Sequence, residues 1–86
     1  MKLPIIKHLT EFIEENDEDF LVETIETLES LTEVASLKDE ELDVLGEMIS
    51  NLYGALEVHK MTQEGMAKKE ALNTEWHRRI ARKVSI

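Results

Sequence analysis

Residues 42–56 read LDVLGEMISNLYGAL, and their large apolar members recur at intervals of three, four, three and four. In an α-helix this spacing places those members on one stripe. The stripe consists of Leu42, Leu45, Ile49, Leu52 and Leu56. Three small residues, four positions apart, run along its flank, where a second helix can approach the backbone closely. They are Gly46, Ser50 and Gly54. The pattern predicts a helix with a packing surface and indicates no reaction centre.

The segments on either side of this stripe have the same helical period. Apolar residues at one-face spacing predict helices over residues 4–15, 18–34, 37–61 and 66–82. Gly65 fits a helix C-terminus, and the turns between the helices are short. We therefore expect one domain, residues 1–86, with an all-α fold. It is a small antiparallel bundle of three to four helices around 37–61, with dimerisation as a way to complete its core.

Aromatic residues and glycines give further expectations about packing. Phe12 and Phe20 fall on apolar helix faces, and Trp76, with Leu72 and Ile80 four residues to either side, is the expected core anchor of the last helix. Phe20 and Trp76 are therefore expected to be buried. A glycine inside a helix costs about 1 kcal/mol relative to alanine. The glycines at positions 46 and 54 are therefore expected at close contacts.

Charge is unevenly distributed along the chain, which has a formal net charge of −9. Residues 1–65 contain 17 acidic and 4 basic side chains, whereas residues 66–86 contain 2 and 6. An acidic body is repelled by nucleic acid phosphates and by anionic lipid, so we expect neither direct nucleic-acid binding nor membrane binding. The acidic body is expected to attract a partner protein with a basic surface instead. The basic end can dock on acidic helices of the same chain or of a neighbouring subunit.

The chain contains no cysteine. This excludes a disulfide framework, a thiolate zinc site and a thiol nucleophile, and nothing demands an oxidising compartment. The apolar run at Leu3–Ile6 is too short for a signal-peptide core, and no later run approaches the length of a membrane span. We therefore expect a cytoplasmic protein.

The sequence contains only weak candidates for catalytic or metal-binding motifs. His8 with Glu11, and Glu57 with His59, raise the question of a metal site, but no Glu-x-x-His motif occurs. The serines have no paired His–Asp spacing, and 86 residues leave little room for both a core and a substrate pocket. We expect no catalytic residue, no metal ligand and no cofactor.

The function predicted from these observations is noncatalytic binding of another protein by a small acidic adaptor or regulator, which forms a homodimer. The candidate interaction residues are Gly46, Ser50, Tyr53, Gly54 and Trp76. Two alternatives remain open. One is an acidic mimic of nucleic acid that blocks a basic binding protein, and the other is a helical bundle that binds a metal or a small ligand, with Tyr53 in a polar niche.

Three stretches of the chain carry a resemblance to other proteins. They are MKLPIIKH at residues 1–8, EENDEDF at residues 14–20 and ISNLYGALE at residues 49–57. These stretches resemble a family of short, acidic, uncharacterised bacterial helical proteins, a domain of unknown function. The resemblance covers roughly residues 1–74 and departs from Glu75 onward. It implies a compact helical protein and supplies no activity, substrate or catalytic residue.

Overall fold

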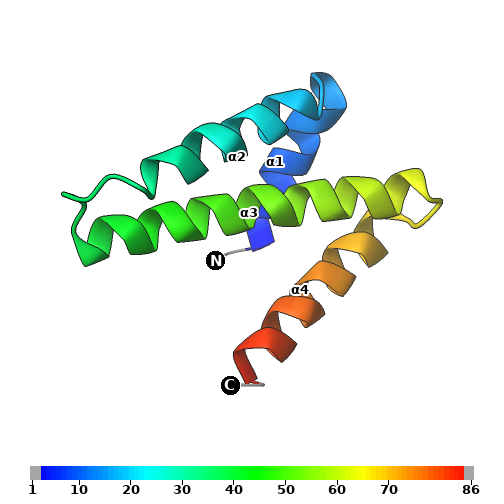
Figure 1. Ribbon diagram of the computed structural model, residues 1–86. Coiled ribbons are helices and arrows are strands. Elements are labelled where there is room, and N and C mark those ends of the chain that lie inside the picture. The colour runs from blue at the N-terminus through cyan, green and yellow to red at the C-terminus, as the bar shows by residue number, and fades with distance from the viewer. Residues whose placement is uncertain (1–2, 85–86) are drawn as a thin grey trace.

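The structure is a computed structural model that describes residues 3–84, with side chains from residue 4 to residue 80. The described residues form four helices: α1 (Leu3–Glu15), α2 (Asp19–Leu31), α3 (Asp39–Gln63) and α4 (Lys68–Val84). α1, α2 and α4 each pack against α3, and α1 also contacts α4 (Figure 1). This arrangement confirms the predicted all-α bundle, with the longest helix at its centre.

α2 ends earlier than the apolar pattern predicts. The expected helix runs to residue 34, whereas α2 ends at Leu31. The backbone N–H groups of residues 32–34 donate to carbonyl groups three positions back, which is the tighter pattern of a 3₁₀ turn. The side chains of Leu31 and Val34 are exposed, so packing does not hold a further α-helical turn in place.

α3 begins and ends two residues later than predicted, and α4 also begins two residues late. At the start of α3, the backbone N–H of Lys38 donates a hydrogen bond of 2.9 Å to Glu41 Oε1. This side chain satisfies a backbone group just before the first turn, which fixes the start of the helix at Asp39. Beyond its end, Gly65 has a φ of 105°, a conformation that favours glycine, so its predicted role as a helix stop is confirmed.

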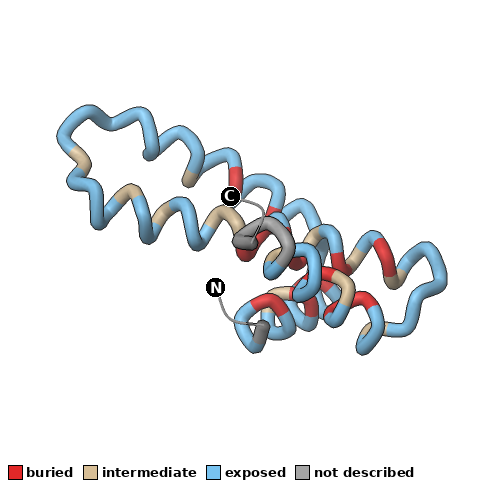
Figure 2. Tube along the Cα trace, turned by 90° about the horizontal axis from the view of Figure 1, so that it is seen from below, coloured by how far each residue is buried: buried red, intermediate tan, exposed pale blue. Residues whose placement is uncertain are grey.

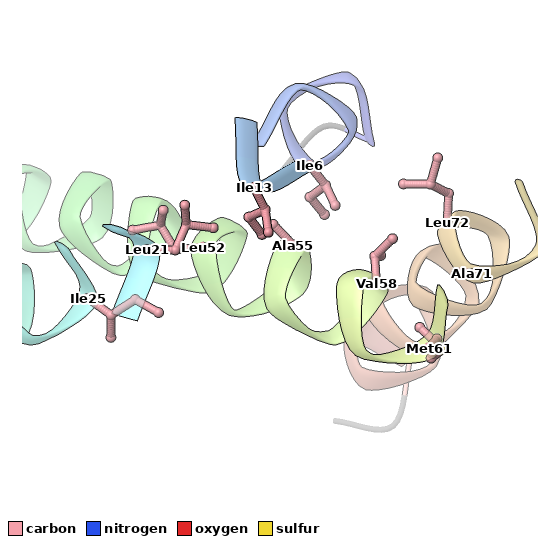
Figure 3. Close-up of a cluster of buried hydrophobic side chains, with 10 residues drawn as sticks. All are labelled: Ile6, Ile13, Leu21, Ile25, Leu52, Ala55, Val58, Met61, Ala71 and Leu72. Atoms are coloured by element: carbon pink, nitrogen blue, oxygen red, sulfur yellow. The ribbon is translucent and has the colours of Figure 1, made fainter. Parts of the chain in front are cut away.

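The buried core lies along the C-terminal half of α3, where all four helices contribute apolar side chains (Figure 3). The buried apolar residues are Ile6, Ile13, Leu21, Ile25, Leu52, Ala55, Val58, Met61, Ala71 and Leu72. Figure 2 shows that the buried positions cluster where the helices meet, and that the α2–α3 connection carries none. The fold therefore has one enclosed end and one open end.

The aromatic side chains do not anchor this core, so that prediction is wrong. Phe12 and Phe20 are exposed and instead pack edge to face, with ring centroids 5.8 Å apart. On α4 the buried anchor is Leu72, whereas Trp76 is 39% exposed. Each step of four residues advances about 40° around a helix. The row from Leu72 to Ile80 consequently turns away from α3.

Candidate functional site

A groove of about 550 Å³ lies between α3 and α4. Four of the five candidate interaction residues line it, all from α3: Gly46, Ser50, Tyr53 and Gly54. The other lining residues are Ile49, Glu57, Glu75, Arg78 and Arg79. The fifth candidate, Trp76, lies outside this lining. The sequence pattern thus located the α3 wall of the groove and did not reveal its α4 wall.

Arg79 ties α4 to α3 beside this groove. Its Nε donates a hydrogen bond of 3.0 Å to Glu75 Oε2, and its Nη1 donates one of 3.0 Å to Ser50 Oγ. Its Nη2 donates to the Ser50 carbonyl oxygen. Glu75 is only 2% exposed, and removing one partner of a buried ion pair is strongly destabilising. Arg79 is therefore a structural clamp. The spacing of four in the sequence indicates its pairing with Glu75 and not its bonds to Ser50.

The two glycines of α3 have different surroundings. A Cβ atom placed on Gly54 would lie 3.1 Å from Ile6 Cδ1 and 3.3 Å from Glu75 Oε2. It would approach Arg79 Nη2 more closely still. The same atom on Gly46 would meet none of the described side chains or backbone atoms within 4 Å. The expected close contact therefore exists at Gly54, whereas the residues that the structure describes give none at Gly46.

Tyr53 connects the wall of the groove with α2. Its hydroxyl donates a hydrogen bond of 3.3 Å to Glu29 Oε2. Partial desolvation raises the pKa of Tyr53 above its usual value of 10.0, and the charge and hydrogen bond of Glu29 and the charge of Glu26 raise it further. The hydroxyl therefore keeps its proton at neutral pH. It serves as a hydrogen-bond donor between two helices.

Residues 26–50, which we call the arm, form the open end of the molecule (Figures 1 and 2). The arm comprises the end of α2, the connection and the first half of α3, and none of its residues is buried. It nevertheless carries many large apolar side chains. They are Leu28, Leu31, Val34, Leu37, Leu42, Val44, Leu45, Met48 and Ile49. The arm also contains eight acidic residues and one basic residue, so its net charge is −7.

α3 carries a second row of residues at intervals of four and three. It lies on a different face from the apolar stripe of residues 42–56, which we call the leucine stripe. The row consists of Val44, Met48, Asn51, Ala55 and Val58. Its second half is enclosed, since Ala55 and Val58 are completely buried, and Figure 3 shows α1 side chains beside Ala55. Its first half is open, with Val44 58% and Met48 46% exposed. The polar Asn51 interrupts the row, so the apolar pattern alone did not reveal it.

Metal sites and membrane spans are two further questions raised by the sequence. Among the described residues, no group of three or more His, Cys, Asp or Glu side chains is placed to hold a metal ion. His59, one of the residues considered, has its Nε2 3.9 Å from Oε2 of Glu18, the residue just before α2. Within the described helices, none combines the length and the apolar character that crossing a bilayer requires.

The match to a known family covers nearly the whole chain. A family of unknown function, DUF6952, matches residues 1–85. The match includes the arm, the groove and the basic end, so it continues past residue 74, where the resemblance seen in the sequence ended. No curated protein and no solved structure matches the chain. The chain therefore belongs to the DUF6952 family of unknown function.

Proposed function

We propose that this protein is a noncatalytic protein-interaction module, a small acidic adaptor or regulator that works as a homodimer in the cytoplasm. The observation that carries the proposal is the arm, residues 26–50, in which apolar side chains are frequent and none is buried. Exposed apolar surface with a polar rim is typical of sites that bind other proteins. The arm is thus the proposed binding surface.

The two apolar faces of the arm have different roles in this proposal. The leucine stripe is half-buried, and its member Ile49 packs against the core together with Leu28 of α2. The second row has no such cover at Val44 and Met48. Burial of apolar surface stabilises an association by about 25 cal/mol per Å² before the costs of binding are subtracted. The pair formed by Val44 and Met48 is therefore the part of the arm that gains most from a partner.

Sedimentation equilibrium tests the self-association. The wild-type chain is compared with the double variant Val44→Gln/Met48→Gln and with the control Ile5→Gln/Val22→Gln, which changes two exposed apolar residues outside the arm. We expect the wild type and the control to form dimers at tens of micromolar and the arm variant to stay monomeric. A monomeric wild type at these concentrations, or a dimer that tolerates the arm changes, would contradict the proposal.

Capture from cells of the native organism, followed by mass spectrometry, tests the adaptor role with the same three proteins. A partner retained by the wild type and the control and lost from the arm variant supports the proposal. Salt-sensitive capture of a basic nucleic-acid-binding protein by all three proteins supports acidic mimicry instead. An extra ion or small molecule in the native mass spectrum supports a ligand-binding bundle.

A further inference from the structure

The described surface carries two apolar pairs, each on adjacent turns of one helix. The arm pair consists of Val44 and Met48 on α3, and the α4 pair consists of Trp76 and Ile80, each 39% exposed. Because both pairs are exposed in the same chain, neither covers the other within one molecule. In Figure 1, α4 leaves the end of α3 at an angle, and it meets the arm only at its border, where Arg79 bonds to Ser50.

The two pairs have opposite electrostatic surroundings. Three glutamates lie one helical turn from Val44 in the arm. They are Glu40, Glu41 and Glu47. α4, residues 68–84, contains six basic residues and two acidic ones, and Glu75, one of these two, is buried. The arm therefore has a formal net charge of −7 and α4 one of +4, although Lys68, Arg78 and Arg79 already form ion pairs within the chain.

We propose that two copies of the chain pair reciprocally, with the α4 pair of each copy seated on the arm pair of the other. A twofold axis makes the two contacts equivalent and closes the assembly at two copies. The apolar pairs supply the buried area, and the acidic arm attracts the basic helix at long range. An arm-to-arm contact would instead bring two charges of −7 together, which repulsion opposes.

This pairing gives a reason for the position of the chain's only tryptophan. Trp76 is not an anchor of the core, since it is partly exposed beside the buried face of α4. Tryptophan is enriched among the residues that dominate protein interfaces, because its large ring buries much area at a small entropic cost. The inference rests on the proposed function and specifies the surface that the arm recognises.

Cysteine cross-linking tests the pairing directly, because the chain contains no cysteine of its own. Isotope-labelled Met48→Cys protein is mixed with unlabelled Ile80→Cys protein and treated with a short bismaleimide. We expect a product that contains one copy of each, at twice the 9.9 kDa of the chain. In the matched control, Val22→Cys replaces Met48→Cys and the mixed product falls to background. A product that joins two Met48→Cys copies in preference to the mixed product would overturn the inference.

The fluorescence of Trp76 provides a second measurement that separates this inference from the proposed function. As the protein concentration rises through the dimer range, we expect a shift to shorter emission wavelength and a severalfold loss of acrylamide quenching. The Val44→Gln/Met48→Gln variant is expected to show neither change. A dimer in sedimentation whose Trp76 stays accessible would leave the proposed function standing and overturn the inference. A monomer would overturn both.

Discussion

The two halves of α3 belong to one continuous helix, yet only the second is enclosed. All of the buried residues of α3 lie between Asn51 and Met61, where α1, α2 and α4 converge. Residues 39–50 run beside α2, and none of them is buried. The same row of side chains passes from open to enclosed within two turns. Helical periodicity is thus a property of the local chain, whereas burial depends on how many other elements reach each turn.

The largest expected effect on stability is a difference between the two halves of α3 when a valine in each is replaced by aspartate. Val58 and Val44 lie on one row, the first completely buried and the second 58% exposed. Val58→Asp places a charge in the core and is expected to lower the free energy of unfolding by about 4 kcal/mol or to prevent folding. Val44→Asp is expected to change it by no more than about 0.5 kcal/mol. Urea unfolding of dilute protein measures both. Comparable losses would show that the arm is as enclosed as the core.

Much of the fold follows from local patterns. The spacing of residues 42–56 was enough to place α3, and the neighbouring patterns placed the other helices to within three residues. The position of the core along α3 was not predictable, because it depends on where α1 and α4 cross. For the same reason the pattern placed Phe20 and Trp76 in the core, although both are exposed. Residue spacing identifies which side chains share one face of a helix, but it does not show whether another helix covers that face.

The α3 wall of the groove was predicted, and the α4 wall was not. Small residues beside a large stripe indicate where another helix can approach, and Ser50 and Gly54 indeed meet α4. The basic run in α4 was interpreted as an end that docks on acidic helices, which does not identify Ser50 as a partner. The clamp formed by Arg79 needs a partner 29 positions earlier in the chain. No local pattern contains that information.

A medium effect is expected from alanine at the two glycines, one in each half of α3. Gly46→Ala adds a methyl group that no described atom approaches within 4 Å, and it is expected to stabilise the protein by about 1 kcal/mol through helix propensity. Gly54→Ala pushes its methyl group against Arg79, which Ser50 and Glu75 hold in place. We expect a loss of about 1 kcal/mol or more from this overpacking.

Thermal unfolding of both alanine variants beside the wild type measures this contrast. The two melting temperatures are expected to move in opposite directions, upward for Gly46→Ala and downward for Gly54→Ala. If Gly54→Ala were stabilised as much as Gly46→Ala, the Arg79 side chain would have to move away without loss. The clamp between α3 and α4 would then contribute nothing to stability.

The smallest expected effect concerns Tyr53, which stands at the border of the two halves and donates a hydrogen bond back to Glu29 of the arm. Tyr53 is the only tyrosine, so the absorbance change near 295 nm reports its ionisation alone. We expect a titration midpoint above 10.0 in the folded protein, because desolvation and the nearby glutamates raise its pKa. Glu29→Gln is expected to lower the midpoint without restoring the usual value, since the larger contribution of desolvation remains. Glu26→Gln is expected to lower it less.

The raised pKa of Tyr53 also predicts how the hydrogen bond between Tyr53 and the arm responds to pH. The folded state holds the proton of Tyr53 more tightly than the unfolded state does, so its contribution to stability is complete below pH 10.0. That contribution decreases as the pH rises from there through the pKa of the folded state. Tyr53→Phe removes it, and the stability of this variant is expected to depend less on pH in that window. A wild-type midpoint at or below 10.0 would contradict this prediction and would mean that Glu29 does not hold the hydroxyl.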